Sequence, residues 1–179
     1  MKVVFALFVA GVVALVLQGA LATIVPPPWC PDLGLLVVIT IGLRWRALGT
    51  GLVLAAGLGF AADLLSGSLV GQHALLRLIA FASAYFAGRQ LNLKGSLPLV
   101  VFTISVSFVY GIAVYVVSSF FVGAGAPSVG WVVDGVQHAV VNGVLVNTVF
   151  RIVSRVAVWA GDAGGAGRTI HIEARRRPA

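Results

Sequence analysis

Charged residues are scarce in this chain of 179 residues, and that scarcity excludes most soluble folds. Only 9% of the residues are Asp, Glu, Lys or Arg, and 60% are hydrophobic. A typical soluble domain has about 25% charged residues. We therefore expect an all-α integral membrane protein without a separate soluble domain.

Cysteine and catalytic motifs are also nearly absent. The single cysteine, Cys30, excludes an internal disulfide and a cysteine-based metal cluster. The sequence has no Gly-x-Ser-x-Gly, no Walker loop and no His-Glu-x-x-His. We therefore expect that the protein is not an enzyme and that it has no catalytic residue, metal site or cofactor. The net charge of +7 would suggest nucleic acid in a soluble protein, but basic residues in membrane proteins mainly flank the spans, so we expect no nucleic acid partner.

What the chain does have is a series of long apolar runs, which predict six membrane-spanning helices of about 20 residues each. The first run is interrupted only by Gln18 and ends before three prolines. Ala20-Leu21-Ala22 resembles a signal-peptide cleavage site, but the length of the run favours an uncleaved span. The second run is short, so it is either buried among its neighbours or begins at the membrane interface. The predicted spans cover residues 3–25, 29–43, 47–65, 69–88, 97–122 and 131–150, with a helical continuation to about residue 158.

The basic residues predict the orientation of these spans. With the N-terminus in the cytoplasm, eleven of the twelve Lys and Arg residues fall in cytoplasmic segments, and the twelfth, Arg77, lies within the fourth span. Because cytoplasmic loops of membrane proteins carry an excess of Lys and Arg, we expect six spans with both ends in the cytoplasm. Residues 161–179 form a glycine-rich and then basic tail, which we expect to be disordered and cytoplasmic. The tail either touches anionic lipid or only orients the protein.

Small residues recur at helical spacing in the third and fourth spans. Such residues let membrane helices approach closely. They predict either a tightly packed bundle or a binding surface for a partner's helix, and the sequence does not choose between the two. The residues are Ala55, Gly59 and Ala62 in the third span, and Ala80, Ala84 and Gly88 in the fourth.

Three ionisable residues surround the turn between the third and fourth spans. Asp63 lies before the turn, and His73 and Arg77 lie after it on one helical face. We expect Asp63 and Arg77 to form an ion pair that locks the hairpin. The alternative is a ligand or proton site, since ionisable groups within membranes often mark function.

The sixth span has a second polar face. Asp134, His138 and Asn142 follow one another at four-residue spacing. Such residues form hydrogen bonds across helices, and they could also line a proton path. A proton relay would need acids through the full depth of the membrane. The acids within the predicted spans all lie toward the outer side, so hydrogen bonding is the favoured interpretation.

Several of these residues together resemble the MreD family of bacterial rod shape-determining membrane proteins. Pro31-Asp32-Leu33 opens the short second span, Gly59-Phe60-x-x-Asp63 ends the third, and a glycine turn with Gly71 follows. The resemblance covers about residues 1–158. It implies the six-helix fold of the substrate-binding S components of ECF vitamin transporters, and motif residues Pro31, Asp32, Gly59, Phe60, Asp63 and Gly71.

The resemblance implies a role rather than a reaction. MreD proteins act in the cytoplasmic (inner) membrane with the bitopic protein MreC and the actin-like MreB. This assembly guides the glycosyltransferase RodA and its penicillin-binding transpeptidase during lateral peptidoglycan synthesis. We therefore expect a non-enzymatic scaffold of cell elongation that binds MreC laterally and contacts lipids, either as a single copy or as a homo-oligomer. The alternative is an S-component-like solute-binding subunit of a transporter, whose pocket would be lined by His73, Arg77, His138 and Asn142.

Overall fold

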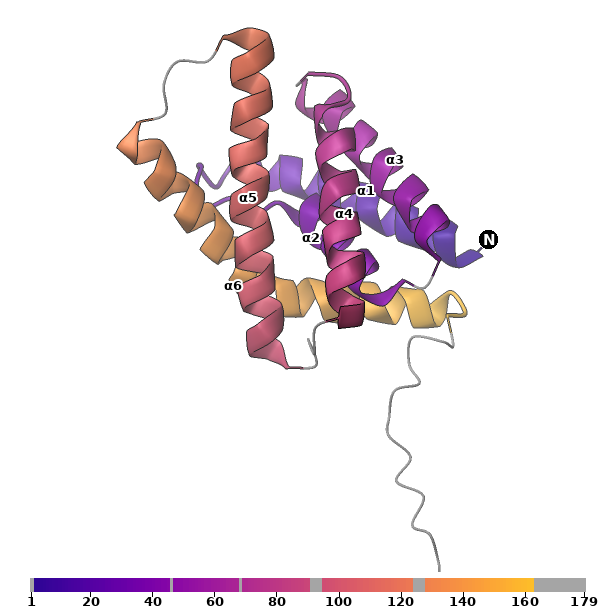
Figure 1. The fold of residues 1–179 in the computed structure, drawn as a ribbon. Helices are drawn as coiled ribbons and strands as arrows, with labels where there is room; N and C mark the ends of the chain where they lie inside the picture. Colours follow the sequence, from indigo (N-terminus) through magenta and orange to yellow (C-terminus); the bar gives the residue numbers. More distant parts are fainter. Residues whose placement is uncertain (1, 46, 68, 91–94, 124–127, 163–179) are drawn as a thin grey trace, which may run out of the picture.

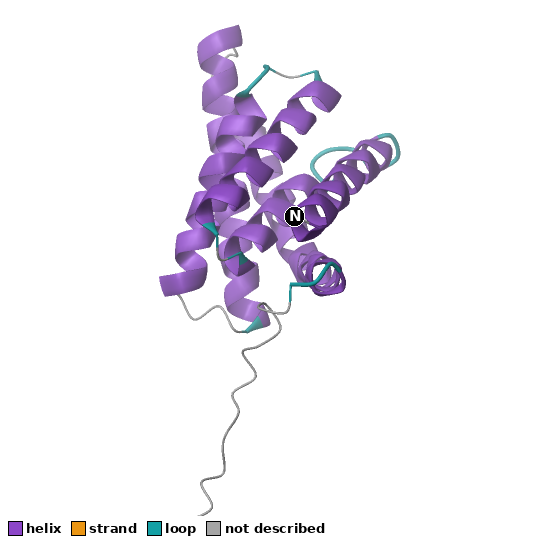
Figure 2. Ribbon diagram, turned by 90° about the vertical axis from the view of Figure 1, so that its right-hand side faces the viewer, coloured by secondary structure: helices purple, strands orange, loops and turns teal. Residues whose placement is uncertain are grey.

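The residues that the structure describes form six α-helices, whose arrangement is drawn in Figures 1 and 2. The structure is a computed structural model that describes residues 2–45, 47–67, 69–90, 95–123 and 128–162. The predicted all-α architecture with six helices is confirmed; most of the expected tail, residues 163–179, lies outside the described residues. The helices are α1 (Lys2–Ala22), α2 (Leu33–Arg44), α3 (Leu48–Ser66), α4 (Gln72–Gln90), α5 (Ser96–Val122) and α6 (Val129–Trp159).

Four of the helices, α1, α3, α5 and α6, are long and apolar enough to cross a membrane. Their outward faces carry large exposed apolar side chains, such as Phe5, Val53 and Val144. Exposed apolar surface of this extent suits lipid rather than water. The chain is therefore a multi-pass membrane protein. The two remaining helices differ, because α2 has only 12 residues and α4 carries polar residues at both ends and Arg77 in between.

The short helix α2 lies at the centre of the bundle and contacts all five other helices. Its residues 34–42 are all buried. A helix that is apolar on every side has to be buried, and this explains how 12 residues are held without a full span's length. The small residues of α4, Ala80, Ala84 and Gly88, pack on α2. At Gly88 the contact is so close that a methyl group would lie 2.8 Å from the carbonyl oxygen of Leu43. The small residues of α4 thus serve packing within this chain.

Helices α3 and α4 form an antiparallel hairpin. At Gly59 the two backbones are so close that a β-carbon would lie 2.4 Å from the α-carbon of Ala74. The turn uses Gly67 and Gly71 with φ of 64° and 93°, a region that favours glycine. The hairpin geometry expected from the sequence therefore depends on glycine at the contact and in the turn.

Helices α5 and α6 form a second hairpin, and α6 runs obliquely past the lower ends of α5 and α4 in Figure 1. At their contact, a β-carbon on Gly143 would lie 2.5 Å from the Ile104 side chain. The capping of α6 is local: the Ser128 hydroxyl accepts a hydrogen bond from the Trp131 N–H. The second hairpin brings Ser107 and Asn142 against the start of α2.

Candidate functional site

A buried cluster of polar side chains surrounds the first turn of α2. We call it the polar cluster and define it as Asp32, Arg77, Ser107, His138 and Asn142. It draws on the α2 N-cap and on α4, α5 and α6. Because unpaired polar groups are costly in a low-dielectric interior, the hydrogen bonds within the cluster decide which helices are held together.

Asp32 and Arg77 form an ion pair at the centre of the polar cluster. The Nη2 of Arg77 lies 3.1 Å from Oδ1 of Asp32, and the Arg77 side chain is only 1% exposed. The same carboxylate oxygen caps α2 by accepting a hydrogen bond of 2.8 Å from the Leu35 N–H. The Nη1 of Arg77 donates to the Leu58 carbonyl of α3 at 2.9 Å. One arginine thus connects α4 to both α2 and α3.

Glycine at position 34 makes room for this guanidinium group. A β-carbon there would lie 2.7 Å from Nη2 and 2.9 Å from Nη1 of Arg77. The Gly34 N–H is bonded from the other side, since it donates to the Gln18 side-chain oxygen of α1 at 3.1 Å. Gln18, the polar interruption of the first apolar run, therefore fastens α1 to the start of α2.

Asn142 connects α5 and α6 to the start of α2 through its side-chain amide. Its Oδ1 accepts from the backbone N–H of Asp32 at 2.9 Å. Its Nδ2 lies 3.3 Å from the Ser107 hydroxyl and 3.2 Å from Nε2 of His138. The side chain is completely buried. Asn142 therefore fixes α5 and α6 against the N-terminus of α2.

Asp63 has a different task from the one expected from the sequence. Its carboxylate accepts hydrogen bonds from the backbone N–H groups of Gly71, His73 and Ala74, at 2.9, 2.8 and 3.3 Å. These groups open α4, where a helix end leaves N–H groups without helical partners and favours negative charge. The ion pair of Arg77 is made with Asp32, which corrects the expected Asp63–Arg77 pair. The Asp63 carboxylate thus does hold the hairpin together, but by hydrogen bonds to backbone N–H groups at the start of α4 rather than by an ion pair with Arg77.

Replacing Asp63 with alanine should lower the free energy of unfolding by about 2 kcal/mol, because the first turn of α4 loses its cap. Asparagine at this position should cost about 1 kcal/mol, since it keeps an acceptor and loses the charge. Chemical unfolding in detergent would measure both changes. Hydrogen exchange should accelerate at the Gly71 and His73 amides. The control is Asp134→Ala at an exposed residue, which should stay within about 0.5 kcal/mol; an equal loss there would contradict the capping role.

The remaining predicted polar residues divide into those near the polar cluster and those apart from it. His73 lies beside it and shares a hydrogen bond of 2.6 Å between its Nδ1 and the Tyr110 hydroxyl of α5. His138 and Asn142 meet as their spacing predicts. Asp134 is exposed in the second turn of α6, and within the described ranges no hydrogen bond or ion pair joins it to the cluster. The three-residue polar face predicted on α6 is thus reduced to two members.

The motif residues serve the fold in different ways. Asp32 and Asp63 cap helices and Gly59 permits the closest helix contact. Gly71 turns the chain and donates its N–H to Asp63, and Pro31 is buried next to Asp32. Phe60 is 47% exposed, so it contributes little to the buried core. Sequence reasoning missed Gln18, Ser107 and Tyr110 as partners; only Gln18 gave a signal, as the one polar residue in an apolar run.

Across the described part of the chain, no three His, Cys, Asp or Glu side chains gather in a way that could hold a metal ion. The chemistry of the polar cluster is mutual hydrogen bonding. No protein-family model, curated protein or solved structure matches the chain. The case for a function therefore depends on the residues and their geometry.

Proposed function

We propose that this chain is a non-enzymatic scaffold of the cell-elongation machinery in the inner membrane of a rod-shaped bacterium, similar in role to MreD. In this proposal it binds the membrane helix of MreC laterally and helps to organise lateral peptidoglycan synthesis. MreB, RodA and its penicillin-binding transpeptidase belong to the wider assembly. All six helices are embedded in the membrane, in a fold similar to that of ECF S components.

The distribution of basic residues supports this topology. Both ends of the chain lie in the cytoplasm in the proposed orientation, because eleven of the twelve basic residues then fall on that side. Helices α2 and α4 count as embedded, although neither is among the four long apolar helices. The burial of α2 and the ion pair of Arg77 make this placement physically reasonable, because a charge in a membrane interior is tolerated when it is paired.

The observation that carries the scaffold proposal is the direction of the polar groups. Arg77 contacts Asp32 and the Leu58 carbonyl, and Asn142 contacts the Asp32 N–H, Ser107 and His138. These groups bind one another and fix the helices. A solute-binding subunit would instead need several of them to face an accessible polar pocket. The arrangement therefore favours a rigid body with binding surfaces over the transporter alternative.

The proposal predicts a shape defect when the protein is depleted. Rod-shaped cells without it should become round within a few generations, and the wild-type chain should restore them. The Asp63→Asn variant should also restore the rod shape if it still reaches the membrane. Microscopy with membrane-fraction blots would measure both. Normal rods that need a vitamin supplement would overturn the scaffold role and favour the transporter alternative.

Lateral binding predicts crosslinks to the partner's membrane helix. A Cys30→Ser background would carry one cysteine at a time on the outward face of a helix, paired with single cysteines along the MreC membrane helix. Suitable exposed positions are Val53 in α3, Phe86 in α4, Val116 in α5 and Val144 in α6. We expect disulfides from one or two adjacent helices only. Their absence from every helix would contradict lateral binding, and disulfides between two copies would indicate self-association.

A further inference from the structure

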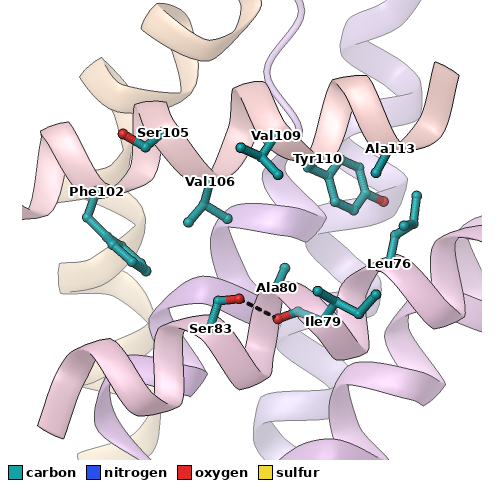
Figure 3. A pocket seen from close by; sticks show the side chains of 10 residues that line it. All are labelled: Leu76, Ile79, Ala80, Ser83, Phe102, Ser105, Val106, Val109, Tyr110 and Ala113. Carbon is teal, nitrogen blue, oxygen red and sulfur yellow. Dashed lines mark hydrogen bonds between the residues drawn. The ribbon is translucent and has the colours of Figure 1, made fainter. Parts of the chain in front are cut away.

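A groove between α4 and α5 lies outside the polar cluster. It has a volume of about 270 Å³ and is lined mainly by apolar side chains (Figure 3). Its two serine hydroxyls are already bonded: Ser83 donates to the Ile79 carbonyl and Ser105 to the Val101 carbonyl, each within its own helix. The groove therefore offers mainly apolar surface, and both of its serine hydroxyls already have hydrogen-bond acceptors.

The groove is closed at one end by polar contacts between its two walls. The Gln72 side chain donates to the Val114 carbonyl and the Ser118 hydroxyl, both at 3.1 Å. The next residue, His73, shares a hydrogen bond with the hydroxyl of Tyr110, which lies one turn before Val114 on α5 and itself lines the groove. These bridges cross the path that an object lying along the groove would follow. An occupant has to end there rather than pass through.

Beyond its other end, α4 continues to the level of Arg89, whose side chain lies on the face of the helix that packs toward Tyr85 and Trp45. From Ser83 on the groove wall to Arg89 near the end of α4 is six residues, or about 9 Å along the helix axis. The Arg89 guanidinium lies over the Tyr85 ring at 3.3 Å and donates to the Tyr85 and Trp45 carbonyls. A cation at this level of a membrane protein attracts anionic headgroups.

We propose that the groove holds one acyl chain of a phospholipid whose headgroup lies at the membrane level of Arg89. A methylene group takes nearly the volume of a water molecule, about 30 Å³, so the groove accommodates roughly nine carbon atoms. A transmembrane helix is about 10 Å across and runs the full membrane thickness, which suits neither this volume nor the closed end. The lipid belongs to the leaflet next to Arg89, which is the cytoplasmic leaflet in the orientation proposed above. The site itself does not depend on the scaffold role.

The test uses the full chain in vesicles of phosphatidylethanolamine and phosphatidylglycerol. A trace of the phosphatidylglycerol carries a photoreactive diazirine midway along one acyl chain. After illumination, mass spectrometry locates the label. We expect residues 76–83 and 102–113 to be labelled at least threefold more than exposed positions elsewhere, such as Val53 and Val144. Even labelling of all exposed faces would show bulk lipid only and would overturn the proposal.

A matched pair of substitutions tests the groove directly. Val106→Phe fills the groove, since Val106 lies on its wall (Figure 3), and should lower groove labelling at least threefold. Val53→Phe adds the same volume on a lipid-facing side of α3 and should leave it unchanged. If Val106→Phe does not fold, Ser83→Phe fills the groove from the exposed opposite wall. Unchanged labelling in a folded groove variant would overturn the proposal.

Two further arms identify the source of the occupant. Arg89→Gln should lower groove labelling by the phosphatidylglycerol probe about twofold, whereas Arg151→Gln at the start of another cytoplasmic segment should not; equal effects would overturn the headgroup assignment. If a second copy of the chain fills the groove instead, labelling should rise as the protein is diluted in lipid. A rise of that kind would also overturn the proposal.

Discussion

Replacing Arg77 with leucine should lower the free energy of unfolding by about 3 to 5 kcal/mol, the cost of removing one partner from a buried ion pair. The loss leaves the Asp32 carboxylate buried without its counter-ion and the Leu58 carbonyl without its donor. Chemical unfolding of the full chain in detergent micelles would measure the change. The large value follows from burial, because the same pair on a water-exposed surface would be worth less than about 1 kcal/mol.

The partner of Arg77 can be identified by rescue. In the Arg77→Leu background, Asp32→Asn should recover about 1 to 3 kcal/mol. The change removes the uncompensated charge, while asparagine still caps α2. Asp63→Asn in the same background should recover nothing, because Asp63 caps α4. Rescue by the second substitution and not the first would contradict the geometry and restore the pairing expected from the sequence.

Replacing Gly59 with alanine should lower the free energy of unfolding by about 3 kcal/mol, toward the upper end of the usual cost of overpacking. The new methyl group would meet the Ala74 α-carbon at 2.4 Å and the His73 carbonyl oxygen at 2.5 Å. Because these are backbone atoms, the two helices would have to separate, and the Asp63 cap would be disturbed with them. Thermal unfolding of the detergent-solubilised chain would report the loss.

The control for Gly59 is Gly111→Ala in α5. Gly111 lies inside a helix, but a β-carbon there meets nothing within 4 Å. Alanine should therefore keep or raise the stability, by up to about 1 kcal/mol from reduced backbone freedom. Equal losses at both positions would show that glycine is needed for reasons other than the α3–α4 contact.

The helices could be predicted from the sequence because five of the six apolar runs are long and the turns are marked by glycine, proline or basic residues. The burial of α2 is one of the two alternatives that its short run predicts, and a helix that is apolar on all sides favours it. The groove between α4 and α5 could not be predicted, because in the sequence its walls have the same apolar composition as any helix surface that faces lipid.

The partner of Arg77 shows where sequence reasoning reaches its limit. Helical depth placed Asp63 and Arg77 near each other across a turn, and that estimate considered one hairpin only. Asp32 is 45 residues away from Arg77 in sequence, and only the packing of α2 against α4 brings the two together. Asp63 also gave no capping signal, because it caps the helix that follows the turn rather than its own. The contact between His138 and Asn142 could be predicted from their spacing because both residues lie on one helix.

The distance in sequence between the partners of the polar cluster has a consequence for biogenesis. Helix α4 carries a charge that a membrane-inserting segment tolerates poorly, about 2.5 to 3.5 kcal/mol at the centre of a span. Its counter-ion, Asp32, precedes it by 45 residues and therefore leaves the ribosome before Arg77 does. The amide of Asn142 follows 110 residues after Asp32. The order of the chain thus supplies the anion first, the cation second and the final hydrogen bonds last, so that the sixth helix completes an interior that the first four have begun.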